Sequence, residues 1–389
     1  MMNFCYLCTR FNKKVMYDQI QEDVLYLMLY AGVMVLSLIA CCYLLLRRAN
    51  AFAPDVTPPL RLRRWTAAFF AATALCHLWY LPMYFLSSRD DVMMGYQIAG
   101  LLDCMTVIPL LIVLPLVMLQ DCRRPLWTVW AMVMPLVAGR VWCIATRSDT
   151  LLLWLFGYFV LICIGFVVYI VWATRQYGRW LHDNYADLEH KEVWQSFVVL
   201  AIFLLTSAVY SFDMGDMAYE YMMEVNIVIL VCYLLWRVET LSDLSTPVQT
   251  DTVLTTSDAE EETDTTENKG LSLTTSNNIG SLLKRHCEEP QLYLQHDISA
   301  VQLAKLIGTN RLYLSKYFAS QGVTYNAYIN GLRIQHFINL YHETVATHQP
   351  IAVQQLAHQS GFRSYSTFYL AFKQSMGMTA SEWMRASKL

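Results

Sequence analysis

Charged residues are scarce in this chain of 389 residues: 15% are Asp, Glu, Lys or Arg, whereas 56% are hydrophobic. Soluble globular proteins usually carry about 25% charged residues. The shortage argues against a wholly soluble protein and favours one that lies largely in a membrane. The length allows two or three domains.

Motifs that carry catalysis are missing as well. The sequence contains no glycine-rich phosphate loop, no HExxH motif, no nucleophile elbow and no paired-carboxylate arrangement. Most of the eleven cysteines lie in apolar runs, where cysteine behaves as a small hydrophobic residue. Cys5 and Cys8 form a CxxC pair without a second pair or a nearby His, which does not suffice for a metal site. We therefore expect neither an enzyme nor a bound cofactor or metal ion.

Charge is distributed unevenly and divides the chain into three segments. Residues 1–240 carry 17 Lys and Arg against 18 Asp and Glu, a net charge of −1. Residues 241–278 carry one Lys against eight acids, a net charge of −7. Residues 279–389 carry ten basic against five acidic residues, a net charge of +5. We treat these segments as three domains.

The first segment contains apolar runs long enough to cross a bilayer, which takes roughly 20 residues in a helix. Seven runs qualify, near residues 24–46, 65–86, 96–119, 126–146, 150–173, 193–212 and 222–239. The first run is too long for the core of a signal peptide and lacks a small-residue cleavage site. The sequence therefore predicts an all-α, seven-helix transmembrane bundle in residues 1–240.

Basic residues concentrate in alternate loops between these runs. Ten Lys and Arg lie in three loops, residues 47–64, 120–125 and 174–192. The loops between them hold two, Arg89 and Arg147. Because cytoplasmic loops are enriched in Lys and Arg, seven spans would place the N-terminus outside and everything after Arg237 in the cytoplasm.

Three basic residues near the start, Arg10, Lys13 and Lys14, would then lie outside. Translation from Met16 in place of Met1 would remove them, and N-terminal sequencing distinguishes the two starts.

Ionisable side chains lie inside the predicted spans, among them His77, Asp103 and Arg140. Such a group near the middle of the bilayer costs on the order of 2.5–3.5 kcal/mol. At 1.5 Å per helical residue, Asp103 and Arg140 both lie roughly 10 Å deep, so antiparallel neighbours would let them pair. One interpretation is a structural clamp. The other is a polar pocket, open to the outside and including His77, that senses a ligand.

Residues 241–278 are acidic, rich in Ser and Thr, and without apolar periodicity. Such a composition cannot bury enough apolar surface to offset its ordering entropy, so it predicts a flexible linker. As a random coil, its 38 residues would span about 30–37 Å.

The last segment contains an internal repeat. Residues 303–328 align with residues 356–383 across two one-residue insertions. Each copy has a Leu-Ala pair, a Gly four residues after the Ala, two large apolar residues at i and i+4, and a Gly-x-Thr. The pattern predicts two helix-turn-helix units, about 299–319 and 352–374.

Each feature of the repeat has a structural reason. Gly308 and Gly361 would supply a positive φ in the turn between two closely crossing helices. The apolar pairs that would anchor the second helices are Leu314/Phe318 and Phe368/Phe372. The predicted helix caps are Ser299, Thr324 and Thr379.

The outer face of each second helix carries side chains suited to DNA. In the first unit these are Asn310, Arg311, Leu312, Ser315 and Lys316. In the second unit they are Arg363, Tyr365, Ser366, Thr367 and Tyr369. These residue types contact phosphates, base edges and thymine methyl groups, and the segment is basic. The pattern predicts binding to double-stranded DNA.

Residues 279–389 resemble the DNA-binding domain of the AraC/XylS family of bacterial transcription regulators. The motif GF-x-S-x-S-x-F-x(3)-F-K-x(3)-G-x-T, from Gly361 to Thr379, carries the resemblance. It implies two helix-turn-helix units joined by a long helix, about 324–342. It further implies recognition helices, about 310–319 and 364–374, that enter successive major grooves.

The resemblance has two departures and a limit. The family usually has Arg where this chain has Leu370 and Pro where it has Ala380. The first departure suggests that the second unit contributes less affinity than the first. The resemblance does not reach residues 1–278, where members of the family normally carry a soluble sensor.

These features together predict a transcription regulator of the bacterial inner membrane. An external or membrane-borne small-molecule or protein signal would change promoter binding, and the other expected partners are the bilayer, RNA polymerase and a second copy in a homodimer. One alternative is a receptor or transporter whose DNA-binding tail is a secondary feedback element. Another is release of the tail by cleavage in residues 241–278. Activation and repression both remain open.

Overall fold

The structure is a computed structural model, and it divides into two compact units. The first comprises Met1–Tyr177 and Glu192–Pro247, and the second comprises Gly178–Lys191 and Val248–Leu389. The described residues are 23–47, 50–53, 56–86, 88–148, 150–212, 217–244, 273–348, 350 and 352–387. The sequence-based division at residue 240 grouped Gly178–Lys191 with the first segment, whereas in the structure these residues cluster with the second unit.

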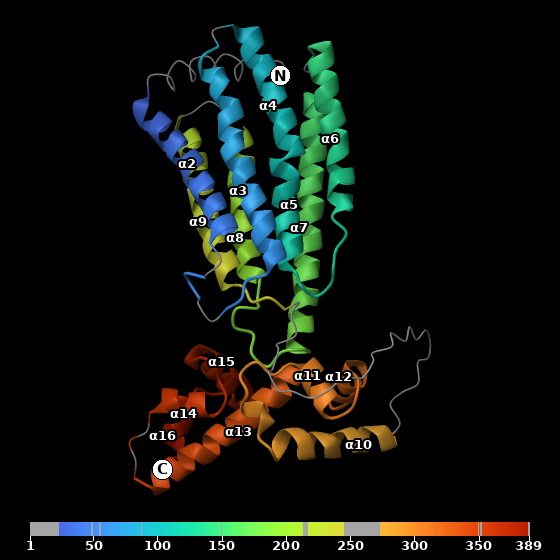
Figure 1. The fold of residues 1–389 in the computed structure, drawn as a ribbon, viewed down its shortest axis with the longest axis vertical. Helices are drawn as coiled ribbons and strands as arrows, with labels where there is room; N and C mark the ends of the chain where they lie inside the picture. Colours follow the sequence, from blue (N-terminus) through green and yellow to red (C-terminus); the bar gives the residue numbers. More distant parts are fainter. Residues whose placement is uncertain are drawn as a thin grey trace. The chain divides into compact units, whose positions relative to one another are not determined.

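The described part of the first unit is helical (Figure 1). Its elements are α2 (Val24–Leu46), α3 (Leu60–Tyr80), η1 (Leu81–Tyr84), α4 (Arg89–Met105), α5 (Val107–Met118), α6 (Trp127–Thr146), α7 (Leu152–His182), α8 (Trp194–Phe212) and α9 (Met217–Thr240). Helix α2 packs against α3 and α9, and α4 packs against α5 and α6. Helix α7 begins in the first unit and ends in the second.

Six helices in the described residues are long and apolar enough to cross a membrane, which corrects the expected count of seven. They are Val24–Leu46, Leu60–Met83, Asp90–Met118, Trp127–Thr146, Leu152–His182 and Glu220–Thr240. The remaining predicted run, 193–212, corresponds to α8, whose apolar part in the described residues is Trp194–Thr206. Helix α8 as a whole runs from Trp194 to Phe212.

The predicted run 96–119 is interrupted where α4 ends and α5 begins. Thr106 lies between the two helices with φ −125° and ψ −70°, outside the helical region. Pro109 lacks an N–H and leaves the carbonyl of the residue four positions earlier, Met105, without its helical partner. This explains a break at the end of α4.

Large apolar side chains remain exposed on the surface of the first unit. On α7 they include Leu153, Trp154, Leu161 and Val168, each more than 60% exposed. A soluble protein rarely presents such a surface to water, whereas lipid contact requires it. The first unit is therefore compatible with insertion into a membrane.

The described part of the second unit is also helical. Its elements are α10 (Leu273–Leu283), η2 (Lys284–Glu288), η3 (Leu292–Leu294), α11 (Ala300–Leu306), α12 (Arg311–Ser320), α13 (Tyr325–Ala346), α14 (Val353–Gln359), α15 (Tyr365–Met376) and α16 (Ala380–Ala386). Helix α10 begins at Leu273, so the end of the predicted linker 241–278 is helical. Most of that linker lies outside the described residues.

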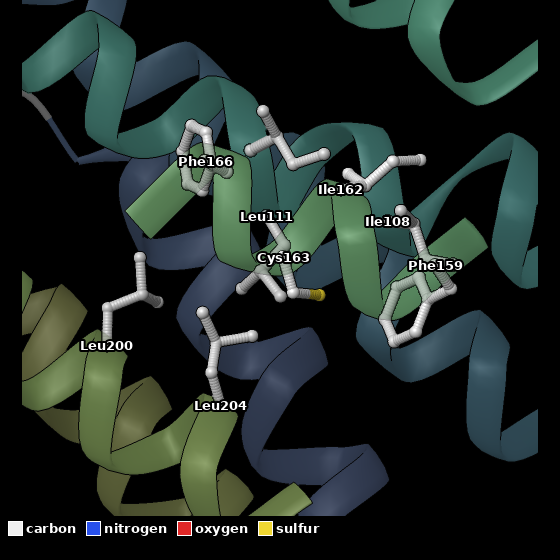
Figure 2. Close-up of a pocket in the computed structure, with 9 residues that line it drawn as sticks. Ile108, Leu111, Phe159, Ile162, Cys163, Phe166, Leu200 and Leu204 are labelled. Atoms are coloured by element: carbon white, nitrogen blue, oxygen red, sulfur yellow. The ribbon is translucent and has the colours of Figure 1, made fainter. Parts of the chain in front are cut away.

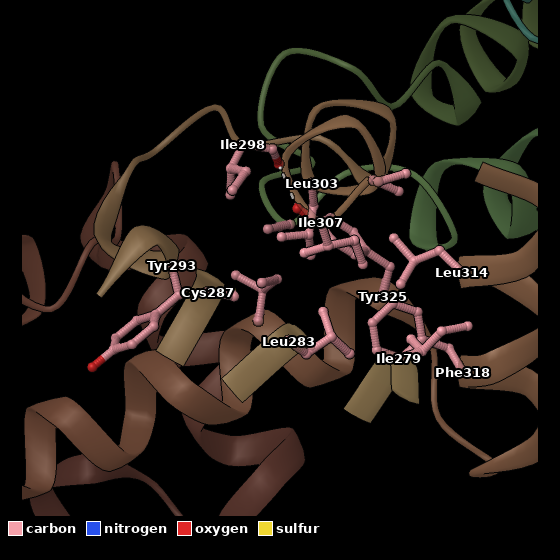
Figure 3. Packing of buried hydrophobic residues seen from close by; sticks show 14 residues of the cluster. Ile279, Leu283, Cys287, Tyr293, Ile298, Leu303, Ile307, Leu314, Phe318 and Tyr325 are labelled. Carbon is pink, nitrogen blue, oxygen red and sulfur yellow. Dashed lines mark hydrogen bonds between the residues drawn. The ribbon is translucent and has the colours of Figure 1, made fainter. Parts of the chain in front are cut away.

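Helix α13 separates two apolar cores, one for each predicted unit. In the first core (Figure 3), Leu303 of α11 and Leu314 and Phe318 of α12 are buried with Tyr325 of α13. In the second core, the ring centroid of Phe337 on α13 lies 4.6 Å from that of Phe368 and 5.7 Å from that of Phe372. The structure thus contains both predicted apolar pairs and the long connecting helix.

The predicted caps and turns are confirmed. Ser299 forms a capping box with Gln302, and Thr379 forms one with Glu382. The Thr324 hydroxyl accepts a hydrogen bond from an N–H in the first turn of α13. Gly308 and Gly361 have φ of +70° and +87°.

Arg333 of α13 is the largest fully buried side chain in the second unit. Its guanidinium donates to the carbonyl oxygens of Tyr293 and Gln295, both at 2.7 Å, and lies 5.7 Å from the ring centroid of Phe362. Burial lowers the pKa of Arg333, because desolvation disfavours the charged form. One of the ten basic residues counted in residues 279–389 therefore does not contribute to the surface.

Candidate nucleic-acid interface

All five predicted contact residues of the first recognition helix, α12, and its N-cap are exposed. Arg311, Leu312, Ser315 and Lys316 are exposed, while Leu314 and Phe318 hold the opposite face in the core. Asn310 precedes the helix, and its side-chain oxygen accepts a hydrogen bond from the N–H of Leu312. That oxygen is used by the helix, so the amide N–H₂ group is what Asn310 can offer to DNA.

The second recognition helix, α15, begins with a connected group of hydroxyls. Ser364 caps the helix by accepting a hydrogen bond from the N–H of Thr367. Its hydroxyl lies 3.0 Å from that of Ser366 and 3.1 Å from that of Thr367. Two predicted DNA contacts, Ser366 and Thr367, are therefore ordered by a residue that the sequence prediction omitted. Ser364 could have been found because a Ser directly before a helix is a preferred cap.

The outer face of α15 is aromatic and apolar. Tyr365 and Tyr369 are 39% and 36% exposed, and Leu370 is 66% exposed. Lys373 is also exposed and lies four residues after Tyr369, so the two share a helix face. The sequence prediction did not include Lys373, although this spacing indicated it. The helix thus offers stacking, apolar and hydroxyl contacts, with one lysine.

Arg363 lies immediately before α15 and is the least exposed of the predicted basic contacts. Its Nη1 is 3.5 Å from Oδ1 of Asp297, and its side chain is 26% exposed. The same carboxylate oxygen lies 3.8 Å from Nζ of Lys191. Asp297 therefore forms ion pairs with two cations beside the second recognition helix.

The predicted ligand-sensing residues of the first unit have separate partners. His77 Nε2 is 3.1 Å from a carboxylate oxygen of Glu224, and both side chains are buried. Asp103 accepts hydrogen bonds from the Tyr80 hydroxyl at 2.7 Å and the Trp79 indole at 3.2 Å.

Arg140 donates to the side-chain oxygen of Gln97 at 2.8 Å. The hydrogen bonds of the described residues give Asp103 and Arg140 different partners, while the two charges still attract each other electrostatically.

An apolar pocket lies between α5, α7 and α8 (Figure 2). Its lining is Ile108, Leu111, Ile112, Phe159, Ile162, Cys163, Phe166, Leu200 and Leu204. None of His77, Asp103 and Arg140 lines it, so it is distinct from the predicted polar pocket. Within the described residues no group of three or more metal-ligating side chains occurs, and Cys5 and Cys8 lie outside those residues.

Comparison with known proteins bears on the second unit. Residues 303–386 match a family model described as a helix-turn-helix domain. A stretch of 76 residues, 20% of the chain, is 38% identical to the TCP pilus virulence regulatory proteins of two Vibrio cholerae serotype O1 strains. The match spans 26% of those relatives, about a quarter of their length. No solved structure matches the chain.

Two recognition helices that share one connecting helix, with hydroxyl and basic side chains facing outward, define a double helix-turn-helix domain of the kind that binds DNA in transcription regulators. Residues 303–386 form an AraC-type helix-turn-helix domain. The family resemblance read from the sequence is thereby confirmed for this part of the chain.

Proposed function

We propose that this chain is a membrane-integrated transcription regulator, in which an external or membrane-borne cue changes how an AraC-type domain binds a promoter. One observation carries the proposal. A single chain combines six helices that are apolar enough to span a membrane with a domain that presents two recognition helices.

The recognition helices would enter two successive major grooves on one face of the duplex. Arg311 and Lys316 supply the basic contacts of α12, whereas the exposed Leu370 on α15 suits an apolar contact with a thymine methyl group. The first helix-turn-helix unit would therefore provide most of the phosphate and base-edge contacts. The second helix-turn-helix unit would add shape and apolar complementarity.

The proposal requires the second unit to face the cytoplasm, where the DNA is. The concentration of Lys and Arg in the loops 47–64, 120–125 and 174–192 supports that orientation. We place the chain in the bacterial inner membrane, with the N-terminus outside. By resemblance to the family, a second copy of the chain and RNA polymerase are the expected protein partners.

The sensor would use the buried polar contacts of the first unit. The His77–Glu224 pair joins α3 to α9, and the bond between Arg140 and Gln97 joins α6 to α4. A ligand that competes for one of these partners would change how two helices pack. His77, Asp103 and Arg140 remain the proposed ligand-sensing residues.

The proposal is tested by chromatin immunoprecipitation with sequencing of the tagged full-length protein in its own cell. Specific promoter regions should be enriched. Enrichment should fall when Arg311 or Lys316 is replaced by Ala, because each loss removes about 1–3 kcal/mol of binding free energy. Lys284→Ala is the matched control, since this exposed lysine lies outside both recognition helices. No enrichment in the wild type, or equal enrichment in all variants, would refute the proposal.

A further inference from the structure

A short segment between α7 and α8, residues 184–191, is held against the helix-turn-helix domain. The N–H of Ala300 donates to the carbonyl of Asn184 at 2.9 Å, and Tyr185 forms an isolated antiparallel bridge with Ser299. We call residues 184–191 the docking segment. It starts two residues after the end of α7, and it belongs to the same compact unit as the domain.

Two asparagines of α13 anchor the middle of the docking segment. The amide of Asn326 donates to the carbonyl oxygens of Ala186 at 2.7 Å and Tyr185 at 3.2 Å. Asn330 donates to the same Ala186 carbonyl at 3.3 Å. Ala186 is 1% exposed and packs in the apolar core of the first helix-turn-helix unit. The segment is thus fitted into this unit by both backbone and side chain.

The far end of the docking segment reaches the second recognition helix. The hydroxyl of Thr367, in the first turn of α15, donates to Oε2 of Glu189 at 3.4 Å. Lys191 lies 3.8 Å from Asp297, which also pairs with Arg363 at 3.5 Å. Both Arg363 and Thr367 are residues that the sequence assigns to DNA contact.

We propose that the docking segment is an internal ligand of the second recognition helix, and that its Glu189 carboxylate occupies the position of a DNA phosphate. The proposal rests on the proposed function, because it presumes that α15 approaches DNA. A docked segment then weakens DNA binding, and its release strengthens it.

The chemistry of the contact supports competition. A hydroxyl in the first turn of a helix, beside an arginine, is a group that contacts phosphate oxygens. A carboxylate in the same place satisfies that hydroxyl and repels an approaching phosphate. Asp187 adds a second negative charge, buried and attracted electrostatically to Lys191 and Arg333. The segment therefore presents the carboxylates of Asp187 and Glu189 to a basic domain, together with its own cation Lys191, which pairs with Asp297.

The strengths of the contacts suit a reversible device. The anchor on α13 consists of several hydrogen bonds, whereas the contact with α15 is a single hydrogen bond at 3.4 Å. The tip is therefore easier to displace than the anchor. Because α7 leads directly into the segment, a movement of α7 would pull on the same loop that contacts Thr367.

The test compares Glu189→Gln with Glu192→Gln in the full-length protein reconstituted in nanodiscs of zwitterionic lipid. Each substitution removes one carboxylate from the same loop. Only Glu189 contacts the helix-turn-helix domain, whereas the carboxylate of Glu192 accepts a hydrogen bond from the Trp194 indole. The probe is a fluorescent 40-bp duplex of random sequence, since phosphate contacts are independent of sequence. Binding is followed by anisotropy from low to moderate salt.

Glu189→Gln should bind the duplex about five- to tenfold more tightly than the wild type at low salt. Its plot of log K against log salt should be steeper by about 0.9, the value for one additional phosphate contact. Glu192→Gln should match the wild type. Equal or weaker binding by Glu189→Gln overturns the proposal.

Failure of the proposed function gives a different result. In that case neither the wild type nor Glu189→Gln would show salt-dependent binding that Lys316→Ala weakens. If Lys316→Ala weakens binding while Glu189→Gln has no effect, DNA binding stands and the competing role of the docking segment is refuted.

Discussion

Gly361 is the turn residue of the second helix-turn-helix unit, and replacing it with Ala tests the architecture of this unit. Two costs combine at this position. Its φ of +87° lies in the left-handed region, which costs a residue with a Cβ about 1–2 kcal/mol. The added Cβ would also lie 2.7 Å from the Cα of Leu294, a backbone atom that cannot rotate away. Relieving such an overlap by backbone shifts costs about 1–3 kcal/mol.

The sum of the two costs predicts that Gly361→Ala destabilises the second helix-turn-helix unit by about 2–5 kcal/mol. Gly308→Ala is the matched control in the equivalent turn of the first unit. Its φ is +70°, and a Cβ there would meet no atom within 4 Å. Only the conformational cost applies, so the control should lose about 1–2 kcal/mol.

Hydrogen exchange on the full-length protein in nanodiscs provides the measurement, since exchange by α13 amides reports the free energy of opening of the surrounding structure. Protection near Phe337 should fall more in Gly361→Ala than protection near Ile329 falls in Gly308→Ala. Equal losses in the two variants would show that the segment around Leu294 does not pack against this turn. The reasoning from the close approach would then be wrong.

Two further predictions concern the second compact unit, which contains both helix-turn-helix units. Arg333→Met should lower its stability by about 3–5 kcal/mol, because the carbonyls of Tyr293 and Gln295 lose a charged donor in a buried place. Faster exchange across η3 would report this, and unchanged exchange would show that Arg333 does not hold that segment. Thr379→Ala should cost about 1 kcal/mol through loss of the α16 capping box. It should raise exchange in α16, whereas Ser381→Ala, an exposed neighbour, should not.

Local patterns in the sequence predicted most of the second unit. Ser299, Thr379 and the turn glycines could be read from the sequence because a cap or a turn depends on a few neighbouring residues. The apolar pairs, such as Phe368/Phe372, could be read because i, i+4 spacing places both on one face. The connecting helix was predicted at about 324–342 and extends to Ala346.

Contacts between distant segments could not be read in this way. Residues 184–191 contain no pattern that indicates Asn326 or Thr367 as partners, so the docking segment was assigned to a membrane loop. Arg333 was counted only in the net charge of residues 279–389, because its burial depends on where the chain around Tyr293 passes. Pro109 carries a local signal for the break between α4 and α5, because a proline inside a helix removes a backbone hydrogen bond.

If the first unit spans a membrane as proposed, helix α8 determines on which side of that membrane the second unit lies. Its 19 residues contain no charge, and a helix of that length is about 28 Å long, close to the roughly 30 Å of hydrocarbon. The apolar part in the described residues is shorter, which leaves six helices that qualify. With α8 crossing, the number of spans is odd and the two ends of the chain lie on opposite sides. Without it, they lie on the same side.

Fusions to alkaline phosphatase, which is active only outside the cytoplasm, distinguish the two arrangements. A fusion after Ser148 should be active and one after Asp121 inactive, because the loop at 120–125 is basic and the loop containing Ser148 is not. A fusion after Phe212 should be active if α8 crosses. Activity after Ser148 with none after Phe212 would refute a crossing α8. With Ser148 and the N-terminus outside, the second unit would then also lie outside the cytoplasm, and the proposed function would fail.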